Sequence, residues 1–292
     1  MKTAAAAYPL DVLQSWDHYA DKLSSWVGEA AGQGADLLVF PEYGAMELAT
    51  LAGMNAASDL EASLWAVADR LAEADAIHAR LAAEYGVHIL AASGPAHWEG
   101  PRPVNRARLF GPKGLIGHQD KQIMTRFERE DWDVVPGGEL KLFETELGRI
   151  GCLICYDSEF PLLGRALGEA EILLVPSCTE ALAGYWRVRI GAMARALENQ
   201  CVSVMSSVVG EARWNEAMEI NTGAGGVFGP PDRGFPATGV LAAGEIGRPG
   251  WTFAEIDRAA IEEVRRDGVV LNRTHWAEQE PRIHSVTTVP SI

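Results

Sequence analysis

Residues 35–43, ADLLVFPEY, form a short, nearly continuous apolar run that ends in a proline and a glutamate. A run of this kind is typical of a strand buried on both faces, as in a parallel sheet that is covered by helices. Because Pro41 has no N–H to donate to a sheet ladder, we expect the strand to end there. The stretch therefore indicates an α/β fold.

The segments on either side of this run continue the alternation of strands and helices. Strands are predicted near residues 3–10, 87–92, 105–110, 115–118, 149–155, 172–175 (stopped by Pro176) and 201–209, and helices near 14–32, 59–85, 185–200 and 258–267. Alternation with an embedded hairpin at 105–118 predicts a layered α/β fold. No repeat or linker divides the chain, so we expect one domain over residues 1–270 and a C-terminal extension over 271–292. The apolar start reads as a first strand rather than a secretion signal, since it is short, contains Pro9 and is followed by Asp11.

The composition excludes several classes of function. The chain has 292 residues, of which 48% are hydrophobic and 22% are charged, so a sizeable core is expected. The formal net charge of −15 has the wrong sign for a nucleic-acid or anionic-membrane partner. No apolar run approaches the roughly 18 residues of a membrane helix. Four cysteines are too few for a disulfide framework, which favours a cytoplasmic protein with reduced thiols.

Common cofactor and metal motifs are missing from the sequence. It contains no G-x-S-x-G, P-loop or H-E-x-x-H motif, and the glycine cluster at 223–226 fails the dinucleotide pattern because Phe228 replaces its third glycine. The seven histidines are scattered. Cys152 and Cys155 form a C-x-x-C, but in an apolar strand their side chains would point to opposite faces, against a zinc or redox site. We therefore predict neither a metal nor a cofactor.

Polar residues at the ends of predicted strands point to a nucleophilic site. Glu42, Lys121 and Cys155 each follow such a strand, and ligand sites of open α/β sheets lie outside the carboxyl ends of strands. Lys121 would favour the thiolate of Cys155, and Glu42 would take its proton as general base. Lys121 and the N–H after the cysteine would then hold an oxyanion. Each residue also has an ordinary alternative: a helix cap for Glu42, a solvated turn for Lys121 and a small buried hydrophobe for Cys155.

Four segments in the same order resemble the signature blocks of the carbon–nitrogen hydrolase (nitrilase) superfamily. They are VFPE at 39–42, DK at 120–121 with FERE at 127–130, GCLICYDSEFP at 151–161 and RALEN at 195–199. The resemblance spans residues 3–270. It implies a four-layer α-β-β-α sandwich that pairs with a second copy.

The resemblance also implies roles for individual residues. Glu42 would be general base and acid, Lys121 the oxyanion-stabilising cation, Cys155 the nucleophile, and the backbone N–H of Tyr156 a second oxyanion donor. A second glutamate after the lysine block would be Glu128 or Glu130. We favour Glu128, whose alternative is a surface salt bridge with Arg126 or Arg129.

The residues after the nucleophile favour the amidase branch. Cys155-Tyr156-Asp157 resembles the corresponding residues of the amidase branch, whereas the corresponding residues of true nitrilases are C-W-E. Glu159 stands where the family usually has arginine. We predict a cysteine amidase that releases ammonia from a small carboxamide through a thioester. The alternatives are a nitrilase or N-carbamoyl amino acid hydrolase with the same triad, and a partner-bound ammonia supplier or non-catalytic member.

Candidates for substrate binding and assembly rest on weaker signals. Tyr43, Glu180, Tyr185 and Arg187 follow strand ends or lie near them, and Arg187 or Arg189 would hold a substrate carboxylate. Trp132 and Trp214 would be pocket walls or dimer contacts. The 185–200 helix, with Trp186, Ile190, Met193 and Leu197 on one stripe, and the tail beyond 270 are expected to mediate a homodimer.

Overall fold

Strand β1 (Lys2–Pro9) joins the two halves of the sheet system in the computed structural model, which describes residues 1–291. Its residues Thr3–Ala5 pair in parallel with β2 (Leu37–Val39), and Ala7–Pro9 pair in parallel with β9 (Val202–Glu211). The strand order along this path is β5-β4-β3-β2-β1-β9-β8-β7-β6. Strand β13 pairs antiparallel with β1, while β11 pairs with β9 and β12.

The remaining elements complete the sheets and cover their faces. The other strands are β3 (His88–Ala96), β4 (Val104–Gly111), β5 (Gly114–Asp120), β6 (Leu142–Thr145), β7 (Gly148–Cys152), β8 (Ile172–Ser177), β10 (Ile220–Asn221), β11 (Gly226–Phe228), β12 (Val240–Ala243) and β13 (Gly250–Glu255). The α-helices are α1 (Trp16–Gly32), α2 (Met54–Ser58), α3 (Leu60–Ala68), α4 (Leu71–Tyr85), α5 (Arg126–Glu130), α6 (Pro161–Ala166), α7 (Leu182–Asn199), α8 (Arg258–Asp267) and α9 (Asn272–His275). Short 3-10 helices are η1 (Gly44–Ala52), η2 (Cys155–Glu159), η3 (Glu216–Met218) and η4 (Trp276–Arg282).

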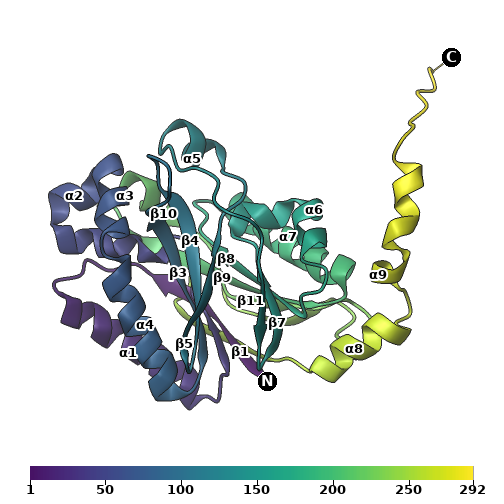
Figure 1. The fold of residues 1–292 in the computed structure, drawn as a ribbon, viewed down its shortest axis with the longest axis horizontal. Helices are drawn as coiled ribbons and strands as arrows, with labels where there is room; N and C mark the ends of the chain where they lie inside the picture. The colour runs from purple at the N-terminus through teal and green to yellow at the C-terminus, as the bar shows by residue number, and fades with distance from the viewer. Residues whose placement is uncertain (292) are drawn as a thin grey trace.

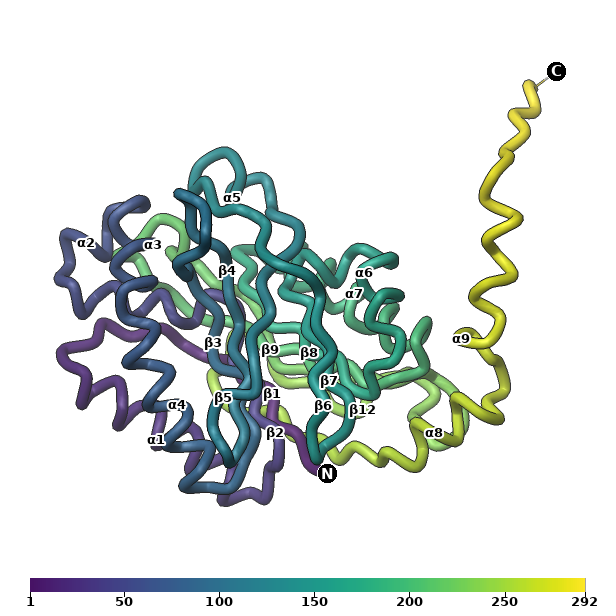
Figure 2. The backbone as a smooth tube through the Cα atoms, viewed as in Figure 1, coloured from purple at the N-terminus to yellow at the C-terminus, as the bar shows by residue number. Residues whose placement is uncertain are grey.

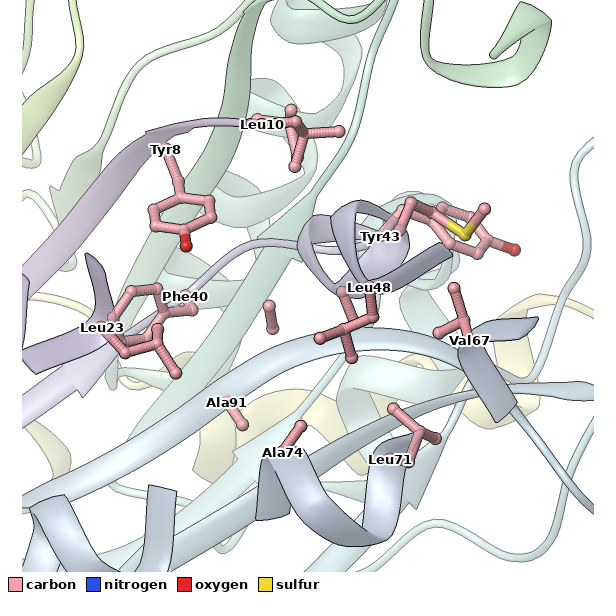
Figure 3. Close-up of a cluster of buried hydrophobic side chains, with 14 of the residues drawn as sticks. Tyr8, Leu10, Leu23, Phe40, Tyr43, Leu48, Val67, Leu71, Ala74 and Ala91 are labelled. Atoms are coloured by element: carbon pink, nitrogen blue, oxygen red, sulfur yellow. The ribbon is translucent and has the colours of Figure 1, made fainter. Parts of the chain in front are cut away.

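The layers are those of an α-β-β-α sandwich, as predicted. Helices α1 and α4 lie on one side of the strands and α6 and α7 on the other (Figure 1). Alternate residues of β2 serve different cores: Leu38 packs in the core that includes α1, α3 and α4, and Val39 packs in the core shared with β7, β8 and β9. Figure 3 shows part of the first core, with Tyr8 of β1, Phe40 directly after β2 and Leu48 of η1.

Local sequence signals explain several element boundaries. Ser15 caps α1 by accepting a hydrogen bond from the His18 N–H at 3.1 Å, and α4 ends at Gly86, whose φ of 66° favours glycine. The predicted helix at 59–85 is two helices, because the chain breaks at residues 69–70 between α3 and α4. Both helices bury apolar residues on the same core.

Two strand predictions need correction. Pro176 lies inside β8 rather than ending it; β7 pairs with β8 only as far as Leu174, so the proline occupies a stretch bonded on the β9 side alone. The strand expected at 149–155 ends at Cys152, and Cys155 begins η2. Cys152 and Cys155 therefore do not share a strand, and the expected alternation of their side chains does not apply.

The C-terminal segment leaves the body of the molecule after α9, whose Arg273 N–H still donates to Gln200 Oε1 at 3.2 Å. Beyond the start of η4, the residues up to 291 project away from the sheets (Figures 1 and 2). Neither α9 nor η4 contains a buried residue. Within residues 1–291, none of the helices combines the length and the apolar character of a membrane-crossing segment.

The buried position of β2 generates a stability prediction. Leu38 has no exposed surface, whereas Leu162 in α6 is 77% exposed. We expect Leu38→Ala to lower the free energy of unfolding by about 2–5 kcal/mol, because it leaves a cavity in the core, and Leu162→Ala to change it by less than about 0.5 kcal/mol. Urea denaturation of both variants measures the difference. Equal effects would show that β2 is not packed as described.

Candidate active site

Four chain segments converge where strands of both halves end. Glu42 follows β2, Lys121 follows β5, Cys155 follows β7 and Cys178 follows β8. β2, β7 and β8 belong to the parallel part of the sheets, and β5 runs with them because two antiparallel steps separate it from β3. Their carboxyl ends therefore deliver all four side chains to one edge, as the sequence predicted for the first three.

A buried lysine between two carboxylates forms the centre of the site. Lys121 Nζ donates to Glu42 Oε1 at 2.7 Å and to the two carboxylate oxygens of Glu128 at 2.8 and 2.7 Å. All three side chains are almost completely buried. Burial alone would lower the pKa of Lys121, but the two carboxylates hold it well above its usual value. The lysine is therefore a fixed cation.

The two carboxylates respond differently to this environment. Burial raises the pKa of Glu42, and Lys121 only partly offsets the rise. Glu42 is further held by Asn105 Nδ2 at 3.0 Å and by the Cys178 N–H at 3.0 Å. Burial also acts to raise the pKa of Glu128. The charge of Lys121 and the hydrogen bonds that Glu128 accepts nevertheless keep this pKa below its usual value. Glu42 is thus the more basic of the two and the better proton acceptor.

Helix α5 fixes Glu128 through a capping box. Thr125 N–H donates to Glu128 Oε2 at 2.8 Å, and the Glu128 N–H donates back to Thr125 Oγ1 at 3.4 Å. Tyr43 Oη donates to Glu128 Oε1 at 2.6 Å. Glu130, the alternative second glutamate, lies at the surface and pairs with Arg126 at 2.7 Å. Glu128 is therefore the glutamate that contacts Lys121.

Cys155 lies on a strained turn that aims its thiol into the cavity. Its φ of 50° is in the left-handed region, which residues other than glycine and asparagine rarely adopt. Asp157, two residues later, accepts from the backbone N–H of Ile123 at 2.8 Å and of Gln122 at 3.1 Å, which ties this turn to the lysine segment. Arg195 of the RALEN segment donates to the carbonyl oxygen of Ser158 at 3.1 Å and braces the turn from α7.

The thiol of Cys155 is not prepared as a thiolate. Burial raises its pKa well above the usual value, Glu42 adds to the rise, and Lys121 opposes both. Lys121 favours the thiolate, as the sequence predicted, but burial and Glu42 together outweigh its effect in the resting site. The proton must leave when the thiol reacts, which requires a base beside it.

Two cavities meet at Cys155. The first, of about 390 Å³, is lined by Tyr43, Lys121, Phe127, Glu128, Trp132, Glu180, Glu216 and Glu219, among others. The second, of about 240 Å³, is lined by Tyr156, Glu159, Glu180 and Arg187, among others. Thr125, Cys155, Cys178 and Glu180 border both. Cys155 therefore lies where the two cavities meet.

The structure separates the predicted substrate residues into two groups. Tyr43, Glu180 and Arg187 line the cavities, and Trp132 is a wall of the first. Tyr185 does not line either cavity. It is buried in the core shared with β7, β8 and β9, where its hydroxyl accepts a hydrogen bond from Arg189 at 3.0 Å. The prediction for Tyr185 is wrong because strand-end proximity alone does not tell which face of α7 is turned inward.

Sequence reasoning missed several residues of the site. Asn105 on β4 binds Glu42, and Cys178 contributes its N–H to Glu42 and its carbonyl oxygen to the Cys155 Sγ at 3.7 Å. Cys178 carried the same signal as Glu42, a polar residue directly after a buried strand. Glu216 and Glu219 carried no signal, because their loop is far from the other site segments along the chain.

Comparison with known proteins gives the same family throughout. The sequence model of the carbon-nitrogen hydrolase family matches residues 2–228. The chain is 30% identical over 265 residues to the probable hydrolase YhcX of Bacillus subtilis, covering 90% of this chain and 51% of that protein, so it spans about half the length of this relative. It is 24% identical over 251 residues to omega-amidase NIT2 of Danio rerio, covering 82% of this chain and 83% of the relative.

Solved structures show the same fold. Nit3 of Saccharomyces cerevisiae, a member of the nitrilase superfamily, superposes with a TM-score of 0.72 at 18% identity, covering 94% of this chain and 96% of that one. A mutant amidase from Nesterenkonia sp. AN1, with acrylamide added at its active site cysteine, superposes with a TM-score of 0.64 at 21% identity, covering 91% and 97%. At these levels of sequence identity, the structural similarity establishes that this chain shares their fold.

The protonated thiol generates a prediction about its reactivity. Because Glu42 raises the pKa of Cys155, we expect Glu42→Gln to lower that pKa and to speed alkylation of Cys155 by iodoacetamide several-fold at a fixed pH below the pKa, since the thiolate reacts. The rate-against-pH curve should shift to lower pH. Peptide mass spectrometry separates Cys155 from Cys178.

A matched control is Glu130→Gln, which removes a surface carboxylate and should leave the rate unchanged. Slower alkylation of the Glu42→Gln variant would contradict the prediction. It would show that Glu42 assists loss of the thiol proton more than its charge opposes it.

Proposed function

The chain belongs to the carbon–nitrogen hydrolase family, as its motifs predicted, and on this premise we propose that it hydrolyses a small carboxamide to a carboxylic acid and ammonia. It is a hydrolase of the amidase/nitrilase type. The observation that carries the proposal is the buried Lys121 ammonium, bound to Glu42 and Glu128 beside a buried thiol that borders a cavity. A fixed cation, a basic carboxylate and a nucleophile are the groups that acyl transfer requires.

In the proposed acylation, Cys155 Sγ attacks the amide carbon while Glu42 takes the thiol proton. The carbonyl oxygen becomes an oxyanion, which Lys121 Nζ and the backbone N–H of Tyr156 stabilise. Collapse of the tetrahedral intermediate breaks the C–N bond. Glu42 returns its proton to the nitrogen, and ammonia leaves a thioester on Cys155. The raised pKa of Glu42 supports both transfers, since its carboxyl can hold the proton between them.

Deacylation uses the same groups in the same roles, with water in place of the thiol as the nucleophile. Glu42 takes a proton from water, the resulting oxygen nucleophile attacks the thioester carbon, and the same donors hold the second oxyanion. The C–S bond breaks, the thiol regains its proton from Glu42, and the carboxylic acid leaves. Glu128 acts as a positioning residue in this scheme, because it fixes Lys121 and keeps it charged.

We also propose that the protein acts as a homodimer through α7 and the C-terminal tail. The stripe on α7 faces solvent in the single chain: Ile190 is 62% exposed and Trp186 is 43% exposed. The tail carries Val286, at 91% exposure, away from the body. Apolar surface of this kind is typical of an interface. Four free cysteines support a cytoplasmic setting, where a thiol nucleophile stays reduced.

Ammonia release from a panel of primary amides, nitriles and N-carbamoyl compounds tests the reaction. We expect amides to be hydrolysed and Cys155→Ala to lose at least about a thousandfold in kcat/KM, because the thioester cannot form. The control Cys201→Ala, in the small core beneath α6, should keep most of the activity. Preference for nitriles or N-carbamoyl compounds would replace the amidase assignment, and activity that survives in Cys155→Ala would refute the nucleophile. Failure on every compound while a partner co-purifies would favour the partner-bound role.

Light scattering at micromolar concentration tests the assembly. We expect a mass of at least twice the 31.5 kDa protomer, and a lower mass for Ile190→Asp, because a charge would be buried in the interface. The exposed substitution Leu162→Asp on α6 is the matched control. A protomer mass for the unmodified chain would contradict the proposal.

A further inference from the structure

We infer that the first cavity selects amides that carry a positive charge, an inference that rests on the proposed function and names its substrate class. The charges that line this cavity are strongly one-sided. Among the described residues of its lining, Lys121 is the one basic side chain, and it faces five carboxylates: Glu42, Glu128, Glu180, Glu216 and Glu219. A substrate that enters the cavity meets a surplus of negative charge.

The basic residues near the thiol are already neutralised. Lys121 is buried and bound to two carboxylates, so it has no free charge for a substrate carboxylate. Arg187, in the second cavity, has its Nε 3.5 Å from Glu159 Oε1. Arg189 lines neither cavity and donates to Tyr185 Oη. Among the described lining residues of the two cavities, no basic side chain without an acidic partner is therefore present for the carboxylate-binding role expected for Arg187 or Arg189.

Three carboxylates at the cavity mouth are exposed and unpaired. Glu180 lies beyond β8, and Glu216 and Glu219 lie in the loop that contains η3. In the part of the chain that the structure describes, no ion pair involves any of the three, although many other acidic side chains of the surface are paired. Side chains from two separate segments thus add like charges around one opening, and a cationic ligand would relieve their repulsion.

Aromatic rings in the same cavity provide a second, independent observation. Tyr43, Phe127 and Trp132 all line it. The Trp132 ring centroid lies 4.9 Å from that of Tyr43 and 5.7 Å from that of Phe127. Clustered ring faces attract ammonium groups through their quadrupoles, and their apolar surface suits an aliphatic spacer.

The thiol sets the orientation of the substrate. Cys155 is buried, borders the same cavity, and its sulfur contacts the Cys178 carbonyl oxygen at 3.7 Å. The amide carbon must reach this sulfur, so the rest of the substrate extends past the aromatic walls toward the acidic mouth. An amide with an ammonium group on a short aliphatic spacer matches this order of groups. A monoamide of a dicarboxylic acid would place its carboxylate among three others.

Three amides of matched length test the inference: 4-aminobutanamide, neutral pentanamide and the anionic monoamide of succinic acid. We expect kcat/KM to be highest for the cationic amide and lowest for the anionic one, with the extremes at least about tenfold apart. About 0.5 M salt should narrow the difference, because the mouth is exposed. An equal or higher kcat/KM for the anionic amide overturns the inference while leaving the proposed function intact.

Substitutions at the mouth assign the effect to its carboxylates. Glu216→Gln and Glu219→Gln should each lower the ratio of cationic to neutral kcat/KM about threefold, since each removes one charge near the ligand. Glu73→Gln, on the exposed side of α4 and outside the cavity, changes the net charge equally and should leave the ratio unchanged. An unchanged ratio in both mouth variants, or an equal fall with Glu73→Gln, overturns the inference.

A measurement that needs no turnover separates this inference from the proposed function. Cationic and anionic methanethiosulfonate reagents modify thiols, and peptide mass spectrometry reports the modification of Cys155. Each rate of modification of Cys155 is divided by the rate of the same reagent with free 2-mercaptoethanol. We expect this normalised rate to be at least about tenfold higher for the cationic reagent than for the anionic one, and the difference to be smaller in Glu216→Gln and Glu219→Gln. No preference overturns the inference. A clear preference together with no hydrolysis of any amide would retain the charge selectivity and reject the amidase reaction.

Discussion

A buried ammonium shared by two buried carboxylates is the interaction on which this site depends. Removing a charge from water costs several kcal/mol per ion, and only close partners with good geometry offset that cost. Lys121 has such partners in Glu42 and Glu128. The three residues come from the end of β2, the end of β5 and helix α5, so one electrostatic cluster joins three segments of the chain. The need to pair this charge fixes the relative positions of the segments more tightly than apolar packing alone would.

The same cluster determines how the nucleophile can react. Burial raises the pKa of the Cys155 thiol, the charge of Glu42 adds to the rise, and Lys121 only partly opposes it. A cysteine in such a place gains no thiolate from its surroundings and depends on a base at the moment of attack. Glu42 meets that need because burial raises its own pKa, so a proton taken from sulfur is held strongly enough to be passed on.

The apolar runs of the sequence predicted a layered α/β fold and the meeting of Glu42, Lys121 and Cys155 at one edge, because these depend on the parallel direction of strands; the four-layer sandwich was implied by the family resemblance. The sequence could not predict the break between α3 and α4, which depends on how both helices pack on one core. It also could not show that Cys155 leaves the strand at a left-handed φ, in a turn that hydrogen bonds of Asp157 and Arg195 tie to distant segments of the chain. The error over Tyr185 has a similar cause: α7 has apolar residues on more than one face, and periodicity does not tell which face is covered.

The departure of Glu159 from the family pattern also has a local explanation in the structure. Glu159 pairs with Arg187 of α7 across the second cavity, so the negative charge that replaces an arginine is matched by a cation one element away. The pair leaves the second cavity without an unmatched charge from either residue. Glu180, which borders both cavities, and Glu216 and Glu219, which border the first, form no ion pair among the described residues. Among the described lining residues of the two cavities, an anionic substrate therefore finds no basic side chain without an acidic partner.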